Sequence, residues 1–134
     1  YLCDASGRIQ TALQAAIVNS GLEYTTVQFF PHMRFLHYSI VGTTLNPHVD
    51  ICRVDPDSGM RSTHTFILYL HDCTEGGETC LLDQLSSPSK VLACISPQRG
   101  RLLLFPHNCP HEGRVVQSVP KLLLRGEVFL SMTA

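Results

Sequence analysis

Hydrophobic positions near the start of the chain recur with the period of an amphipathic helix. Four apolar residues follow one another at i, i+4, i+7 and i+8, which places them on one face: Ile9, Leu13, Ala16 and Ile17. Ser6 is predicted to cap the start of this helix, and Gly21 to close its end in the left-handed conformation. We therefore expect one helix over residues 8–20, and no second segment has this period.

After the helix, short runs rich in Val, Ile, Thr, Phe and Leu alternate with Pro, Gly, Asn and Asp. This pattern predicts nine strands, over residues 25–30, 34–41, 48–54, 63–71, 79–82, 91–95, 101–105, 114–118 and 121–132. Many short strands at close spacing are typical of a closed barrel or a sandwich. A length of 134 residues suits one core. We expect a single mainly β domain over residues 1–134, trimmed from a longer chain because the sequence opens without an initiator Met.

The charge balance excludes functions that depend on a bulk electrostatic field. Ten Lys and Arg against eleven Asp and Glu give a formal net charge of −1 at pH 7, so nothing favours nucleic acid or an acidic membrane. No apolar run is long enough to span a membrane. We expect a specific site that takes a protein or a small molecule as its substrate, and the sequence leaves the oligomeric state open.

Six cysteines are dispersed through apolar runs: Cys3, Cys52, Cys73, Cys80, Cys94 and Cys109. A disulfide framework is usually denser and lies in a shorter, loop-rich chain. The dispersion favours reduced thiols, and with them a cytoplasmic or nuclear location, although one or two disulfides stay compatible with the even count.

Candidate metal ligands lie two residues apart in the middle of the chain. On a strand, His48 and Asp50 share a face and can bind one cation from the same side. His111 would complete a set of two histidines and one carboxylate, which is typical of non-haem Fe(II) oxygenases. A His-x-Asp pair alone is weak evidence, because seven histidines make chance matches common.

Two cations occupy one face of the last predicted strand. Lys121 follows His111 by ten residues, and Arg125 follows four residues later in a strongly apolar run. Each is either a strand-end residue whose head reaches solvent or the partner of a carboxylate on a dicarboxylic cosubstrate bound to the metal.

Several segments follow the chain in a characteristic order: Arg34 to Ser39, Asn46 to Asp50, Thr65 to Asp72, Glu75 to Thr79, Gly100 to Phe105, and His111 with Lys121. In this order they resemble the motifs of the Fe(II)- and 2-oxoglutarate-dependent dioxygenases, and most closely the prolyl 4-hydroxylase-like branch. The segments span about residues 34 to 130, which is nearly the whole domain.

The resemblance implies a double-stranded β-helix, which is a jelly-roll barrel, with helix 8–20 packed outside it. It further implies that His48, Asp50 and His111 bind iron. Lys121 matches the residue that pairs with the C5 carboxylate of 2-oxoglutarate, but Arg125 on the same face stays an alternative anchor. Further residues are implied or expected to line the pocket: Tyr38, Tyr69 and Thr65 beside the cosubstrate, and the apolar Ile40, Ile67, Leu103 and Phe105.

The implied activity couples decarboxylation of 2-oxoglutarate, to succinate and CO2, with hydroxylation of a C–H bond. The implied cofactors are Fe(II), 2-oxoglutarate and O2, with ascorbate in support. A protein side chain such as proline is the expected substrate, and the loops at 54–62 and 84–90 are expected to select it.

Three alternatives stay open at this point. His107, Cys109 and His111, with Cys73 or Cys80, could form a structural zinc site. A jelly-roll domain without catalysis could bind a protein or a ligand. A cupin-like metalloenzyme could use the same barrel without 2-oxoglutarate.

Overall fold

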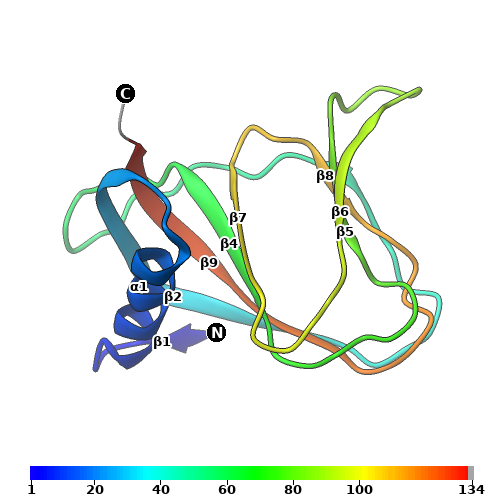
Figure 1. Cartoon of the computed structure of the whole chain (residues 1–134), viewed down its shortest axis with the longest axis horizontal. Coiled ribbons are helices and arrows are strands. Elements are labelled where there is room, and N and C mark those ends of the chain that lie inside the picture. The colour runs from blue at the N-terminus through cyan, green and yellow to red at the C-terminus, as the bar shows by residue number, and fades with distance from the viewer. Residues whose placement is uncertain (133–134) are drawn as a thin grey trace.

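Two antiparallel sheets face each other in the computed structural model, which describes residues 1–132 (Figure 1). The larger sheet has the strand order β1 (Leu2–Cys3), β2 (Tyr24–Tyr38), β9 (Lys121–Met132), β4 (His64–Tyr69) and β7 (Leu102–Pro106). The smaller sheet has the order β3 (Leu45–His48), β8 (His111–Gly113), β5 (Thr79–Leu82) and β6 (Val91–Ile95). The chain crosses repeatedly between the sheets, and the predicted mainly β jelly roll is confirmed.

Helix α1 (Arg8–Ser20), the one helix within residues 1–132, packs on the outer face of the larger sheet (Figure 1). Its buried residues Leu13 and Ile17 join a core that includes Phe66 of β4 and Val128 of β9. Gly21 closes the helix in the left-handed conformation, as predicted. The cap at the other end is Gly7, so the prediction of Ser6 is wrong by one residue.

Alternation along the central strands separates two layers of side chains. On β9, Leu124 and Val128 face the helix, whereas Leu123 packs between the sheets with Ile67 and Phe105. This inner layer lies directly against the candidate site. The expected lining of Ile67 and Phe105 agrees with it, but Ile40 is 71% exposed in the turn after β2.

The strand boundaries differ from the predictions where pairing overrides local sequence. Strands β5, β6 and β9 have the predicted limits. Pro31 predicted a break, yet β2 is continuous, because its pairing with β9 shifts register between Phe29 and Met33 and so leaves the proline outside the regular pairing. Strand β8 begins at His111 instead of residue 114, since it pairs there with both β3 and β5.

One cysteine pair is oxidised. Cys80 and Cys94 occupy opposite positions on β5 and β6 and form a disulfide. The expectation of reduced thiols is wrong for this pair, because only strand register brings the two together. Since disulfides are uncommon in reducing compartments, the cysteines no longer support a cytoplasmic or nuclear location.

Within residues 1–132, no helix is both long and apolar enough to cross a membrane.

The Gly76→Ala variant is expected to lose about 2 kcal/mol or more of folding stability, measured by chemical denaturation. Gly76 has φ +70°, and a Cβ atom there would lie 2.2 Å from the carbonyl oxygen of Val115. Gly100 is the matched control, since it has φ +84° but no atom within 4 Å of its Cβ position. Gly100→Ala should therefore cost only the backbone strain, about 1 kcal/mol, and equal losses would contradict the steric argument.

Candidate metal centre

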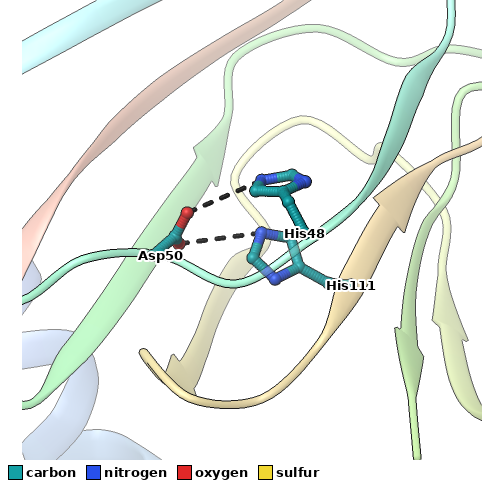
Figure 2. A group of neighbouring side chains, drawn as sticks. All are labelled: His48, Asp50 and His111. Carbon is teal, nitrogen blue, oxygen red and sulfur yellow. Dashed lines mark ion pairs between the residues drawn. The ribbon is translucent and has the colours of Figure 1, made fainter. Parts of the chain in front are cut away.

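Two histidines face each other across neighbouring strands of the smaller sheet. His48 ends β3 and His111 begins β8, and the two are direct partners in the strand pairing. Their ring centroids lie 4.2 Å apart, and the ring of Phe105 lies 4.5 Å from that of His111. Figure 2 shows both imidazoles turned toward the same carboxylate.

That carboxylate belongs to Asp50, two residues beyond the end of β3. Its Oδ1 lies 3.6 Å from Nε2 of His48, and its Oδ2 lies 3.6 Å from Nε2 of His111 (Figure 2). The predicted strand over residues 48–54 is wrong, because the chain leaves the sheet after His48. Asp50 is held instead by a hydrogen bond from its backbone N–H to the carbonyl of His107, 3.0 Å long.

Both imidazoles are prepared to bind a cation through Nε2. Nδ1 of His48 lies 2.7 Å from the carbonyl oxygen of Asn46, and Nδ1 of His111 lies 3.0 Å from that of Cys109. A carbonyl only accepts hydrogen bonds, so in a neutral ring Nδ1 is the nitrogen that carries the proton and Nε2 keeps a lone pair. Burial lowers the pKa of His111, which favours the neutral ring that a metal requires.

Both oxygens of Asp50 have further partners. The Thr65 hydroxyl donates to Oδ2 at 2.6 Å, and the Arg125 guanidinium contacts Oδ1 at 2.9 Å. Behind Thr65, Nδ1 of His107 lies 3.0 Å from the threonine hydroxyl, and its Nε2 lies 2.6 Å from the hydroxyl of Ser62. Because the Thr65 hydroxyl donates its hydrogen to Asp50, it accepts a hydrogen bond from Nδ1 of His107. Nε2 of His107 in turn accepts a hydrogen bond from the Ser62 hydroxyl.

The sequence did not predict that His107 and Ser62 take part in this hydrogen-bond network behind Asp50. His107 was considered only as a zinc ligand, and Ser62 was given no role. Both are buried polar residues in the structure, but a lone His and a lone Ser carry no signal in a single sequence.

A pocket extends from the imidazoles toward Lys121. Residues of both sheets line it, among them His48, His111, Tyr38, Thr79, Lys121 and Arg125. Nζ of Lys121 lies 4.9 Å from the centroid of the Tyr38 ring. The hydroxyls of Tyr69 and Thr79 lie 2.5 Å apart, so Tyr69 contacts the pocket wall from behind.

Lys121 is a buried cation without an ion pair. It is 4% exposed, and none of the ion pairs formed between residues 1–132 includes it. Burial lowers its pKa, and the Cys73 thiol and the Glu78 carboxylate oppose this effect only in part. A buried charge is costly without a counter-ion, so the end of the pocket is suited to an anion.

Comparison with known proteins agrees with this arrangement. The family model described as the 2OG-Fe(II) oxygenase superfamily matches residues 33–126, which is more than half of the chain. The chain belongs to this superfamily. Comparison with curated protein sequences gives no match.

Solved structures share the fold of this oxygenase domain at low sequence identity. A prolyl-4-hydroxylase from Pseudomonas putida is 19% identical with a TM-score of 0.59, over 98% of this chain and 67% of that one. An oxidoreductase of the 2OG-Fe(II) oxygenase family from Burkholderia pseudomallei is 16% identical with a TM-score of 0.56, over 78% of this chain and 47% of that one. The chain thus spans about half to two thirds of the length of these proteins.

Membership of the superfamily makes the chain a dioxygenase that uses Fe(II), 2-oxoglutarate and O2. Its candidate ligand atoms fit an iron ion, because those of His48, Asp50 and His111 all lie within 4.8 Å of one another. Two imidazoles and one carboxylate leave open coordination positions for other ligands.

The zinc alternative finds no support in the part of the chain that the structure describes. There, His48, Asp50 and His111 are the only group of three potential ligands. Both ring nitrogens of His107 form hydrogen bonds with hydroxyl groups, and Cys80 forms a disulfide, so neither side chain is free to bind zinc.

Thr65→Val is expected to weaken Fe(II) binding by about 10- to 100-fold, the usual effect of losing a residue that orients a metal ligand. The change removes the hydroxyl that holds Oδ2 of Asp50. Titration with Fe(II) under anaerobic conditions measures the affinity. Thr65→Ser should retain most of it, and Thr44→Val, at an exposed position, should leave it unchanged. An unaltered affinity in Thr65→Val would contradict the positioning role.

Proposed function

We propose that residues 1–134 act as one catalytic domain that hydroxylates a C–H bond on a protein side chain, with proline as the first candidate. In this proposal, 2-oxoglutarate is converted to succinate and CO2, and ascorbate supports turnover. The observation that carries it is that one pocket is lined both by His48 and His111, two of the three candidate metal ligands, and by Lys121, a buried lysine without an ion pair.

We assign the three ligands to iron and Lys121 to the distal carboxylate of 2-oxoglutarate. Arg125 is the weaker candidate for this anchor, because its guanidinium already contacts Oδ1 of Asp50 at 2.9 Å. The ammonium of Lys121 has no carboxylate partner. Tyr38 lies beside it and restricts the position of an anion bound there.

Each residue of the site has a defined task in this scheme. Iron held by His48, Asp50 and His111 would supply the redox chemistry for the reaction with O2 and 2-oxoglutarate. The two Nε2 lone pairs and Asp50 hold the metal, while Thr65 and Arg125 fix the carboxylate. Ile67, Leu123 and Phe105 keep water from the inner side of the site, because all three are buried between the sheets.

Proline is proposed on the family resemblance and on the name of the Pseudomonas protein that shares the fold. The test incubates the protein with Fe(II), 2-oxoglutarate and a set of blocked proline-containing peptides, with and without ascorbate. We expect succinate together with a peptide that has gained one oxygen atom. Iron binding without any succinate would favour a binding module, and metal-dependent oxidation without 2-oxoglutarate would favour a cupin-like enzyme.

The affinity for 2-oxoglutarate is expected to fall as the pH rises, starting below the usual lysine pKa of 10.5, because burial lowers the pKa of Lys121. Only the protonated amine can pair with a carboxylate, so binding is strongest below that pKa. The folding stability of the protein without 2-oxoglutarate changes in the opposite direction. The lysine binds its proton more tightly in the unfolded chain than in the folded one, so this stability rises with pH. Anaerobic titrations from neutral to alkaline pH measure the effect. Lys121→Arg should abolish the dependence, because the guanidinium stays charged.

A further inference from the structure

A second group of cations lies next to the metal centre, on the far side of Arg125 from Lys121. The inner face of β9 continues from Lys121 through Leu123 to Arg125 and Glu127. Arg34 on β2 is the direct cross-strand partner of Arg125, and Arg53 reaches Glu127 from the segment after Asp50. We call Arg34, Arg53 and Arg125 the arginine cluster.

The arginine cluster contains more positive charges than the neighbouring carboxylates neutralise. Nε of Arg53 lies 3.3 Å from Oε1 of Glu127, and Nη1 of Arg125 lies 3.8 Å from the same oxygen. Arg34 has no ion pair within residues 1–132. The nearby Asp55 carboxylate is bonded to the Ser58 hydroxyl at 2.7 Å within its own turn.

Loading the active site would increase this imbalance. The remaining partner of Arg125 is Asp50, whose charge is needed by the metal. In the loaded site, the charges of Fe(II) and Lys121 are matched by Asp50 and the two carboxylates of 2-oxoglutarate. Glu127 is then the one carboxylate left for three guanidinium groups.

Two observations indicate that the cluster is suited to binding an anion. Nη1 of Arg125 is buried and has no hydrogen-bond partner, although a buried donor is normally satisfied. Arg34 and Arg125 stand directly opposite each other with like charges, a pairing that destabilises a sheet unless an anion lies between them.

The cluster also has the right position for a substrate. A cleft lies on the opposite side of Arg125 from the Lys121 pocket, and its lining consists of Tyr1, His32, Arg34, Arg53, Arg125 and Glu127. Arg125 belongs to both, so a group bound in the cleft would lie close to Asp50 and to the reacting carbon.

We propose that the arginine cluster binds a carboxylate of the substrate that is hydroxylated, close to the C–H bond that reacts. This inference rests on the proposed function and narrows its substrate class to acidic molecules. The carboxylate belongs either to an acidic side chain of a peptide or to a small carboxylic acid. Guanidinium groups suit both, because they bind carboxylates through paired hydrogen bonds.

The test compares acidic and neutral probes on the protein loaded with Mn(II) and 2-oxoglutarate without oxygen, so that no turnover occurs. One pair of probes is the blocked pentapeptides Glu-Gly-Pro-Gly-Glu and Gln-Gly-Pro-Gly-Gln, and the other is N-acetylglutamate and N-acetylglutamine. We expect the acidic probe of at least one pair to bind about tenfold or more tightly by calorimetry, typical of a charge-assisted contact. A preference confined to the peptides assigns the carboxylate to a side chain, and one confined to the amino acids assigns it to a small molecule.

Arg53→Gln and Arg34→Gln should each remove most of the preference, whereas Arg99→Gln should retain it. Arg99 is exposed and lies outside the cleft. Arg125 is left unchanged because it also holds Asp50. Equal binding of acidic and neutral probes, or a preference that survives both cluster variants, would overturn the proposal. Failure to form succinate would contradict the proposed function alone, since the titration measures binding only.

Discussion

An Asp50→Ala variant is expected to lose both Fe(II) binding and succinate formation. Asp50 supplies the one carboxylate of the ligand group, and both of its oxygens lie within reach of the two imidazoles. The loss should exceed about 100-fold, which is the upper range for removing a residue that merely orients a ligand. Anaerobic Fe(II) titration and a succinate assay measure the two effects separately.

Removing Asp50 also leaves the Arg125 guanidinium without its closest partner, so this variant needs a check of folding by thermal unfolding. Asp50→Asn keeps the shape of the side chain and tests the charge alone, and His111→Ala tests an independent ligand. Asp57→Ala, at an exposed position outside the site, is the control and should behave as the wild type. Normal iron affinity in folded Asp50→Ala and His111→Ala would contradict the metal assignment.

The Lys121→Ala variant is expected to lose about 2–5 kcal/mol of 2-oxoglutarate binding energy, because the distal carboxylate would be buried without its partner. Fe(II) affinity should stay close to that of the wild type, since Lys121 contacts none of the three ligands in the ion pairs of the site. Anaerobic titration of the iron-loaded protein with 2-oxoglutarate measures the change. The ligand-free variant should be at least as stable as the wild type, because it no longer buries an unpaired ammonium.

The chain provides a matched control for this experiment. Lys90 is the only other lysine and lies exposed in the loop before β6, so Lys90→Ala should bind 2-oxoglutarate normally. Arg125→Ala should mainly weaken Fe(II) binding, because its closest contact is Asp50. A larger loss of 2-oxoglutarate affinity in Arg125→Ala than in Lys121→Ala would reverse the assignment of the anchor.

The three candidate metal ligands were predicted to lie together for a reason that is only partly the one seen in the structure. The sequence argument placed His48 and Asp50 on one strand, where residues two apart share a face. In the structure, Asp50 lies outside the sheet and is held by the backbone of His107. The motif order selected three residues that lie close together in the structure, but the spacing did not describe the backbone that positions them.

The predicted apolar lining shows a similar limit. Alternation correctly placed Ile67 and Phe105 between the sheets, since both lie in the middle of paired strands. Ile40 was misplaced because β2 ends at Tyr38, and the alternation of a strand has no meaning beyond its last paired residue.

The sequence by itself determined the helix, most of the strands, the jelly-roll class and the family to which the site belongs. These properties depend on local periodicity and on the order of short motifs, both of which are readable along one chain. Only the tertiary structure decided which cation is free for a cosubstrate, which cysteines pair, and how His107 and Ser62 support Asp50. It also brought Arg34, Arg53 and Arg125 together. These features depend on how strands pair and on which loop segments lie beside them, and local periodicity predicts neither. Within a sheet, a shift of the register by one residue would turn every side chain of a strand to the other face.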